Sequence, residues 1–438
     1  MLKIYEDSIN YTCQVIKLPN KVEVPGLNNL CKVSIFGNDC LIGVDSDPEE
    51  LYLFFPAECK IDDDFLKSNN LYRHSELNND KTKTGFFENN GRVRSVKFKG
   101  VVSTGFICPL SFLWNVTSKS GMAILGLNPG DEFNSIANIN ICSKYYKKLP
   151  STPQEKRERK TEDFIDGKMA PQHFDTSHLL KNCNNLNLDD YIAVTYKLHG
   201  TSARYFNTLV KRKLSLLERL CKFIGVKVQK EEYKLVCGSR KVIKSVDFKA
   251  IDDKNHWYKT GDLWTEVGVN YFRDNLNHGE AVYCEIIGKT YGGEAIQSGY
   301  TYGLNLPEIY IYRISNINSQ GIEVDLSYQQ MKERAVQLGI KTCPELFYGT
   351  LEQFILKHIG MNDPHTTEEM LNQIFHNYPE LLEKPSILDC SVIEEGFCIR
   401  IDKYPKPNIY KIKSKKFLEF ETKQIDKKIT NIEDDQST

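Results

Sequence analysis

The stretch Thr195-Tyr196-Lys197-Leu198-His199-Gly200-Thr201-Ser202 determines how the rest of the chain is interpreted. It follows an apolar run, residues 191–194, so Lys197 stands at the end of a predicted strand. A lysine at this place is a candidate nucleophile for covalent nucleotidyl transfer, provided that nearby cations or poor solvation lower the pKa of its amine. Gly200 would let the backbone turn tightly beside a bound phosphate. The pattern Lys-x-His-Gly is weak on its own, so the prediction depends on residues elsewhere in the chain.

The composition is that of an ordinary globular protein. The 438 residues are 40% hydrophobic and 26% charged, which predicts one to three domains. The net charge of -1 provides no overall attraction for nucleic acid, so any site for a polyanion has to be local.

The cysteines and apolar runs indicate the compartment. The 13 cysteines are scattered singly and include no Cys-x-x-Cys pair, which argues against a zinc ribbon or a thioredoxin-type dithiol. Such cysteines are typically reduced and buried, and they favour a reducing compartment. Residues 1–7 lack an apolar signal core, and no run approaches the roughly 20 apolar residues that span a bilayer. We expect a soluble intracellular protein with no membrane partner, either cytoplasmic or nuclear.

Residues 1–145 are predicted to form a first, mainly β domain. Short apolar runs are separated by turn residues, and Asn90-Gly91 predicts a tight turn. It precedes an alternating strand at 92–99, whose irregularity near Ser95 is consistent with a bulge. These features fit a small barrel or sandwich. The four basic residues of that strand could line a phosphate-tracking groove, although their spacing alone favours a solvated face.

The remainder divides into three parts. Residues 146–164 are predicted to be a basic linker, 165–425 a mixed α and β domain, and 426–438 a polar tail. Within the second domain, residues 173–180 have the pattern of an N-capped helix start. Leucines at helical spacing in 214–224 lie among basic residues and predict a basic amphipathic helix. Such a helix is by default solvated on its outer face; an RNA-facing helix is the alternative.

Two acidic positions in this domain are candidates for chemistry. Glu285 lies in an otherwise apolar strand, where a carboxylate is costly unless it binds a metal, a ribose hydroxyl or a cation. Glu394 and Glu395 precede another strand, a place suited to holding a hydrated divalent ion.

Basic and aromatic positions follow the same order along the chain. Arg240, after a predicted strand, could grip a phosphate as a planar fork. Tyr310 and Tyr312 share one face of a strand, and either could stack on a purine, although such tyrosines are more often core residues. Lys411 and Lys413 also share a strand face; they could clamp a triphosphate and lower the pKa of a third lysine, or simply be solvated.

Taken together, these motifs and their order along the chain resemble the covalent nucleotidyltransferase superfamily of ATP-dependent ligases and capping enzymes. The resemblance runs from about residue 165 to 420 and rests on six motifs in order. They are Lys197 to Gly200, Ser239-Arg240, Glu285 to Gly288, Tyr310 to Ile314, Glu395-Gly396 and Lys411-Ile412-Lys413.

His199 and the first domain narrow the resemblance. Most members of the superfamily have Asp where this chain has His199, whereas the branch that resembles bacteriophage RNA ligase 2 has Lys-x-His-Gly-Thr, as here. Residues 69–75 and 85–94 resemble the N-terminal OB domain of Naegleria-type RNA ligases, in which little follows the lysine pair. Here 25 residues follow Lys413, which favours this family over DNA ligases and capping enzymes.

The resemblance implies a fold. It is α+β, with an N-terminal OB-type β-barrel at 1–145 that binds RNA. A nucleotidyltransferase domain, an ATP-grasp-like ligase adenylyltransferase, follows at 165–425 with antiparallel sheets and flanking helices. A monomer is expected.

The resemblance also implies a reaction with ATP and Mg²⁺ or Mn²⁺ as cofactors. The nucleophile Lys197 would form a lysyl-AMP intermediate, AMP would pass to an RNA 5′-phosphate, and a 3′-hydroxyl would displace it to seal the RNA, in RNA repair. Catalytic residues would be Lys197, His199, Arg240, Glu285, Glu395, Lys411 and Lys413. Those binding the nucleotide would be Lys197, Gly200, Arg240, Glu285, Tyr312, Lys411 and Lys413, and the metal ligands would be Glu285 and Glu395.

Other functions remain as alternatives. Gly288-Lys289-Thr290 resembles the end of a phosphate-binding P-loop, but that motif requires glycine where the chain has Tyr283, so a P-loop kinase is excluded. A nucleic-acid-binding protein with a degenerate ligase domain would bind RNA without adenylylation. A DNA-joining or capping enzyme of the same superfamily would seal DNA nicks or prefer GTP.

Overall fold

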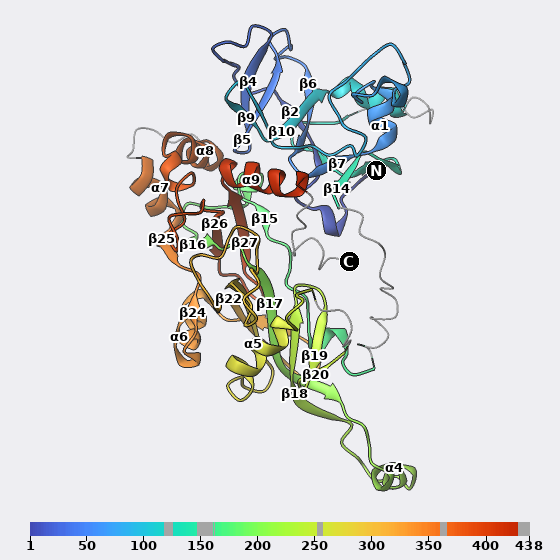
Figure 1. Cartoon of the computed structure of the whole chain (residues 1–438), viewed down its shortest axis with the longest axis vertical. Coiled ribbons are helices and arrows are strands. Elements are labelled where there is room, and N and C mark those ends of the chain that lie inside the picture. The colour runs from blue at the N-terminus through green and yellow to red at the C-terminus, as the bar shows by residue number, and fades with distance from the viewer. Residues whose placement is uncertain (118–125, 147–160, 162, 252–256, 360–365, 428–438) are drawn as a thin grey trace.

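The computed structural model describes residues 1–117, 126–146, 161, 163–251, 257–359 and 366–427. The fold is mixed α+β, as predicted, with an N-terminal lobe above a larger second lobe (Figure 1). The predicted linker at 146–164 and tail at 426–438 lie largely outside the described residues, so the domain boundaries stay a prediction. All 13 cysteines are free, and most are buried, as their scattered spacing predicts. None of the described helices combines the length and apolar character needed to cross a bilayer.

The N-terminal lobe consists of short antiparallel strands. Its main sheet has the order β10-β6-β2-β11, and the hairpin β4-β5 pairs with β3. The strands are β1 Leu2–Lys3, β2 Cys13–Lys17, β3 Val22–Glu23, β4 Leu30–Ile35, β5 Asn38–Gly43, β6 Leu51–Pro56, β7 Cys59–Ile61, β8 Val96–Phe98, β9 Val101–Ser103, β10 Gly105–Pro109, β11 Glu132–Phe133, β12 Ser135–Ile136, β13 Ile139–Asn140 and β14 Cys142–Lys144. Two short α-helices accompany them, α1 Asp63–Ser68 and α2 Trp114–Thr117.

The predicted OB-type barrel is not confirmed. The described strands of this lobe fall into five small sheets, which do not join into one closed barrel. The hairpin β4-β5 instead folds over the main sheet, where Val33 and Cys40 pack with Tyr52 and Phe54 in a separate small core. Layered packing of this kind buries the apolar faces of short strands without closing a barrel.

The strand predicted at 92–99 is only partly present. β8 pairs there with β9, and Arg92 forms an isolated antiparallel bridge with Lys60 of β7. Arg92 is buried and bonds to Glu58 and Asp426, and Arg94 lies 3.6 Å from Asp426. Two of the four basic residues therefore hold protein carboxylates, which explains why this segment leaves the alternating pattern.

The second lobe contains two sheets. The smaller has the order β15-β27-β26-β16-β25 and the larger β20-β19-β18-β17-β21-β22-β23, with β24 beside β22. Pairing is antiparallel except between β15 and β27 and between β22 and β24. The strands are β15 Ser177–His178, β16 Tyr191–Lys197, β17 Thr201–Lys211, β18 Glu231–Ser239, β19 Ile243–Val246, β20 Lys249–Ala250, β21 Glu280–Gly288, β22 Pro307–Ile317, β23 Glu323–Asp325, β24 Lys341–Thr342, β25 Glu345–Thr350, β26 Gly396–Ile401 and β27 Asn408–Lys413.

Helices flank these sheets, as predicted. They are α4 Leu216–Phe223, α5 Leu263–Phe272, α6 Tyr328–Leu338, α7 Leu351–Ile359, α8 Thr367–Asn377 and α9 Lys415–Asp426. The described 3-10 turns of the chain are η1 Glu6–Ser8, η2 Ser75–Leu77, η3 Leu110–Leu113, η5 Gly167–Met169, η6 Cys183–Asn185 and η7 Pro379–Leu381. The predicted helix start at 173–180 is wrong: residues 177–178 form β15 and pair with Tyr410 and Lys411 of β27, so tertiary pairing overrides the local helical pattern.

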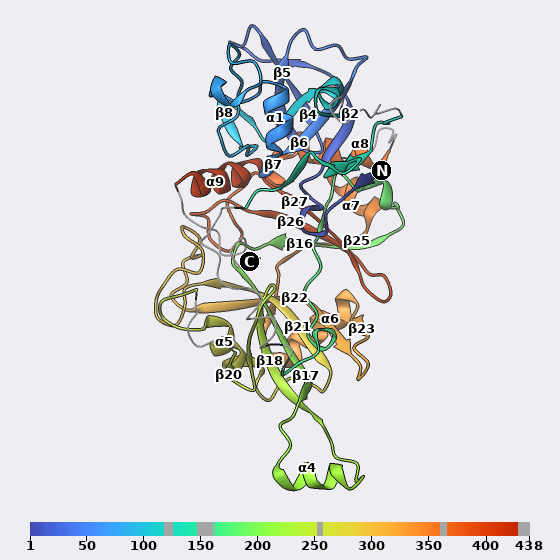
Figure 2. The ribbon, with the colours of Figure 1, turned by 90° about the vertical axis from the view of Figure 1, so that its right-hand side faces the viewer.

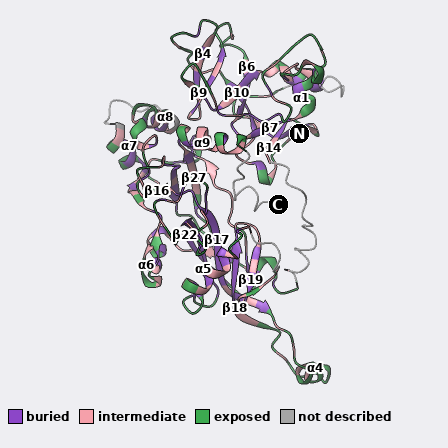
Figure 3. Cartoon of the chain, in the orientation of Figure 1, coloured by how far each residue is buried: buried purple, intermediate pink, exposed green. Residues whose placement is uncertain are grey.

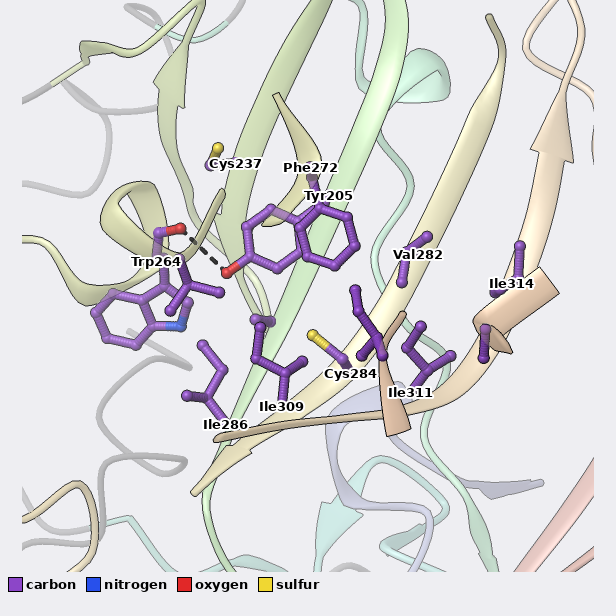
Figure 4. Packing of buried hydrophobic residues seen from close by; sticks show 14 of the residues in the cluster. Tyr205, Cys237, Trp264, Phe272, Val282, Cys284, Ile286, Ile309, Ile311 and Ile314 are labelled. Carbon is purple, nitrogen blue, oxygen red and sulfur yellow. Dashed lines mark hydrogen bonds between the residues drawn. The ribbon is translucent and has the colours of Figure 1, made fainter. Parts of the chain in front are cut away.

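One face of the larger sheet packs against α5 and α6. Figure 4 shows the part of this core around Tyr205, Trp264 and Phe272. Tyr205 of β17 stacks on Phe272 at 4.4 Å between ring centroids. Its hydroxyl donates a 3.0 Å hydrogen bond to the carbonyl of Trp264, so the buried polar end of the ring is satisfied. This core fixes β17 and β21, the two strands that continue into the functional residues.

Helix α9 lies between the lobes (Figure 2). Asp426 at its end accepts from Arg92, and the hydroxyl of Thr422 donates to Glu58, both at 3.0 Å. At its start, Lys415 lies 2.8 Å from Asp39 of β5. The helix that directly follows the predicted lysine pair is therefore bonded to the N-terminal lobe at both ends.

Candidate active site

Lys197 lies where the chain passes from one sheet of the second lobe to the other. It ends β16 of the smaller sheet, opposite Gly396 of β26, and β17 of the larger sheet begins at Thr201. Only three residues separate the two strands, so the Lys-x-His-Gly motif forms the crossing between the sheets. The predicted strand and the position of the lysine at its end are both confirmed.

Glu395 is the acidic partner of Lys197. The Lys197 Nζ lies 2.8 Å from Glu395 Oε1, and Lys413 Nζ lies 3.4 Å from the same oxygen. His199 Nδ1 lies 3.8 Å from Glu395 Oε2. Glu395 is buried, so its charge is balanced mainly by these two lysines rather than by water.

Glu394, the neighbouring acid, faces away from Lys197. Its carboxylate accepts a 3.1 Å hydrogen bond from the N–H of Ile387, and its carbonyl accepts from the Ser414 hydroxyl. Burial raises the pKa of Glu394 to about 7. Of the two acids at this position, only Glu395 belongs to the constellation.

Glu285 and Gly200 are joined directly. The N–H of Gly200 donates to Glu285 Oε1 at 2.9 Å, and Gln297 donates to the Gly200 carbonyl at 2.6 Å. A Cβ on Gly200 would lie 2.2 Å from the carbonyl oxygen of Ile286, a distance that no side chain tolerates. Glycine is therefore required here by the close approach of β21, a reason that the sequence pattern does not provide.

The two lysines of β27 share one face of the strand but differ in environment. Lys413 contacts Glu421 of α9 at 2.7 Å as well as Glu395, and although burial opposes its charge, these carboxylates raise its pKa. Burial, together with Arg240, Lys413 and Lys197, lowers the pKa of Lys411 to about 8. Lys411 is thus the more easily neutralised member of the pair.

Tyr312 lines the cavity beside Lys197, whereas Tyr310 does not. The Tyr312 hydroxyl is 2.7 Å from the Ser202 hydroxyl, and its ring meets His173 edge-on at 5.1 Å between centroids. Tyr310 is buried in a separate apolar cluster and donates to Glu308. The geometry favours Tyr312 as the residue that faces a ligand.

Arg240 also lines the cavity, next to Asp175, with which it forms an ion pair. The strand end that carries it is held by buried Arg204, which donates to the carbonyls of Ser239 and Lys241, each at 2.8 Å. The backbone that carries Arg240 is therefore held in place, and its guanidinium pairs with Asp175, a carboxylate whose place a phosphate could take.

His199 is held among aromatic rings. Its backbone N–H donates to the Tyr302 hydroxyl at 2.8 Å, and its imidazole meets Tyr300 and Phe417 edge-on, each at 4.9 Å between centroids. The side chain is buried between these rings and Glu395. This position suits a residue that orients Glu395.

Most of these residues border one cavity of about 260 Å³ that both lobes line, whereas Gly200, His199 and Glu395 are not among its lining residues. The second lobe contributes Lys197, Ser202, Arg240, Glu285, Tyr312, Lys411 and Lys413. The N-terminal lobe contributes, among others, Asn10, Phe36, Ala57 and Glu58. Residues more than 200 positions apart in the sequence thus meet around one space, slightly smaller than the roughly 300–1,000 Å³ of typical ligand pockets.

The comparison with protein families identifies this arrangement. Residues 190–416 match the family described as RNA ligase, a segment that covers more than half of the chain and every candidate residue of the constellation. The chain belongs to the RNA ligase family. No similar curated protein sequence is found.

Solved structures of Naegleria gruberi RNA ligase share the fold of this RNA ligase family member. A variant with ATP and Mn has a TM-score of 0.55 at 15% identity, over 97% of this chain and 99% of that chain. An apo variant has a TM-score of 0.56 at 15% identity, over 95% and 99%. The ligase with PPi has a TM-score of 0.54 at 17% identity, over 94% and 98%.

The described part of the chain contains no dedicated metal cage. Within the described ranges, no three His, Cys, Asp or Glu side chains come together as a metal site. A hydrated Mg²⁺ ion needs only one or two carboxylates when phosphates supply the other ligands. Glu395 fits this requirement, because its buried Oε2 atom has no hydrogen-bond partner among the described residues.

Several residues around the cavity were missed by sequence reasoning. Asp175 and His173 lie in the segment mistaken for a helix, and Arg204 and Gln297 belong to no short motif. Burial and nearby Arg313 and Arg240 lower the pKa of His173 well below its usual range, so this ring is neutral. The only sequence signal for Arg204 was a charged residue inside an apolar strand, the same signal that identified Glu285.

Proposed function

We propose that this chain is an ATP-dependent RNA ligase that joins 5′-phosphate and 3′-hydroxyl ends through a lysyl-AMP intermediate on Lys197, in RNA repair. The observation that carries the proposal is the contact of Lys197 with Glu395, in a chain that belongs to the RNA ligase family. A lysine beside a buried carboxylate, with two further lysines at the same cavity, is suited to covalent nucleotide transfer.

In the first step, the Lys197 amine attacks the α-phosphorus of ATP. A nitrogen–phosphorus bond forms, the bond to the bridging oxygen breaks, and pyrophosphate leaves. The amine must lose a proton to react, and Glu395 Oε1 is an acceptor at 2.8 Å. Lys411 and Lys413 neutralise the charge on the departing pyrophosphate, since phosphoryl transfer depends mainly on positioning and electrostatics.

A divalent ion, Mg²⁺ or Mn²⁺, would be held by Glu395 and Glu285 together with the phosphates of ATP. It would neutralise the negative charge of those phosphates. Structures of Naegleria gruberi RNA ligase with ATP and Mn, and with AMP and Mn, support ATP and a divalent ion as the cofactors. His199 lies beside the Glu395 carboxylate, with its Nδ1 atom 3.8 Å from Oε2.

Tyr312 holds the adenine. Glu285 accepts a hydrogen bond from the Gly200 N–H and so holds the loop that follows Lys197 in position. In the later steps, Arg240 leaves Asp175 and binds a phosphate. AMP moves from Lys197 to the RNA 5′-phosphate, and the 3′-hydroxyl displaces it. The N-terminal lobe, which lines the same cavity, contacts the RNA end.

An end-joining assay tests this function. The full chain is incubated with ATP, a divalent ion and 5′-phosphorylated strands, either RNA or DNA and either single-stranded or nicked. Joined RNA is the expected product. RNA binding without joining would identify a degenerate ligase, whereas joining restricted to DNA, or a preference for GTP, would place the chain with DNA-joining or capping enzymes.

A further inference from the structure

Helix α4 is separated from the body of the molecule. Strands β17 and β18 pair along nine positions, from Ala203 with Ser239 to Lys211 with Glu231, and then extend past the larger sheet. The helix stands at the tip of this hairpin, far from both lobes (Figures 1 and 2). Nothing in the proposed ligation uses it.

The apolar face of α4 is open to solvent. Phe223 is 88% exposed, Leu216 83% and Leu217 76%, and none of the helix residues is buried (Figure 3). Leu220, Ile224 and Val226 are exposed too. The usual surface helix turns such a face toward the core. The helix is thus a solvated surface helix, which was the default expectation, but its leucines are exposed as well.

The helix is nevertheless well formed. Ser215 and Glu218 make a reciprocal capping box, in which the Ser215 N–H donates to Glu218 at 2.8 Å. Arg212 also bonds to Glu218 and so ties the helix to the end of β17. The capping box stabilises the first turn of α4, so the exposed leucines form an ordered apolar face.

Charge accompanies the apolar face. Residues 211–230 contain seven basic residues and one acidic residue, Glu218, although the whole chain has a net charge of -1. Leu216, Leu220 and Phe223 recur at helical spacing on one face. Arg219 borders this face, and Lys222 lies farther round the helix. The tip is consequently apolar on one side and strongly cationic around it.

We propose that α4 binds the surface of an anionic lipid bilayer and lies in the plane of its headgroups. Exposed Leu and Phe side chains gain free energy by leaving water at the acyl boundary, and Lys and Arg gain it from anionic headgroups. An RNA backbone would satisfy the basic residues but leave the apolar face in water. The distal position allows flat contact with a planar surface without a clash with either lobe.

This surface role differs from membrane spanning. A helix that lies on a membrane needs an apolar face and basic flanks, not the length that crosses the bilayer. The lack of a spanning helix among the described residues therefore does not bear on it.

Co-sedimentation of the full chain with phosphatidylcholine vesicles, with and without phosphatidylserine, tests the proposal. We expect binding only to the phosphatidylserine vesicles. Phe223→Gln should lower the partition coefficient more than about tenfold because it removes a large apolar side chain. Lys222→Gln should lower it about fivefold, the contribution of one basic residue near an anionic surface.

Val336→Gln is the matched control. Val336 is 79% exposed on α6, so its replacement removes a similarly exposed apolar side chain from another helix. It should leave vesicle binding unchanged, and all three variants should unfold at the wild-type temperature because the replaced side chains are exposed.

Three results would overturn the proposal. The first is a wild-type chain that does not bind anionic vesicles, or binds them as well after Phe223→Gln. The second is loss of binding to 5′-phosphorylated RNA, rather than to vesicles, in both α4 variants, which would assign the helix to RNA. The third is a wild-type dimer that Phe223→Gln dissociates, which would assign the apolar face to a second copy.

Discussion

At the scale of single residues, Glu395 links the parts of the site. Its Oε1 atom contacts both Lys197 and Lys413, and Oε2 faces His199. In this arrangement the nucleophile forms an ion pair with a carboxylate. In the proposed first step Oε1 accepts the proton of the Lys197 amine, and Oε2 remains for the metal ion.

Lys411 gives ATP binding a pH dependence. Because its pKa is lowered to about 8, it carries its charge in the free protein below pH 8 and loses it above. Above pH 8, ATP has to bind together with a proton, so its Kd should rise by up to about tenfold per pH unit. Lys411→Arg, which stays charged, should abolish the rise.

Titration calorimetry across pH 7 to 10 in a Lys197→Ala background, where no covalent transfer occurs, measures this effect. A rise in Kd above pH 8 of equal size with Lys411→Arg would show that another group controls the binding.

Gly396, which directly follows Glu395, occupies a position where only glycine fits. Its φ is +150°, and a Cβ there would lie 2.0 Å from the Ile412 carbonyl oxygen. Gly396→Ala should separate β26 from β27, displace Glu395 and destabilise the fold by more than about 2 kcal/mol. Gly167→Ala, at a glycine with open space around its Cβ position, should not lower the stability.

Urea unfolding of the two variants checks this prediction. A Gly396→Ala protein with the unfolding midpoint of wild type would show that the two strands can separate without cost.

At the scale of elements, the sequence predicted the strands that carry Lys197, Glu285 and the lysine pair. Each is a local feature: a polar residue at the end of an apolar run, or inside one. The contacts among them were not predictable, because Glu395 and Lys197 meet only through the pairing of β26 with β16.

The errors have one physical origin. The segment 173–180 has a helical pattern but pairs with β27, and residues 92–95 alternate like a strand but bind carboxylates of other elements. In each case a tertiary environment far away in the sequence overrides a local pattern.

The ion pairs of helix α9 allow a test of how the N-terminal lobe is attached to the second lobe. The Arg92 side chain is 2% exposed and pairs with Glu58 and Asp426, so Arg92→Met leaves the largely buried Glu58, 14% exposed, without its cation. The free energy of unfolding should fall by about 3 kcal/mol. Arg94→Met, at a 30% exposed residue that contacts only the partly exposed Asp426, should cost less than about 1 kcal/mol.

Adding Glu58→Gln to Arg92→Met should restore part of the lost stability, because it removes the unpaired charge. Equal losses in the Arg92 and Arg94 variants would mean that the buried ion pair does not hold α9 to the N-terminal lobe.

At the scale of the whole molecule, the two lobes meet around one cavity. The second lobe supplies Lys197 and its partners, and the N-terminal lobe supplies one wall, with α9 bonded to both. The hairpin that carries α4 points away from this cavity. The molecule thus has a proposed ligation site between its lobes and a separate proposed membrane contact at its far end.

The central claim, that Lys197 carries AMP, is tested most directly by transfer of label from α-labelled ATP to the protein. The wild-type chain and a Lys403→Ala control, which changes an exposed lysine paired with Asp190, should both become labelled. Lys197→Ala should remain unlabelled at every pH and metal concentration. Labelling of Lys197→Ala at the wild-type level would contradict the account.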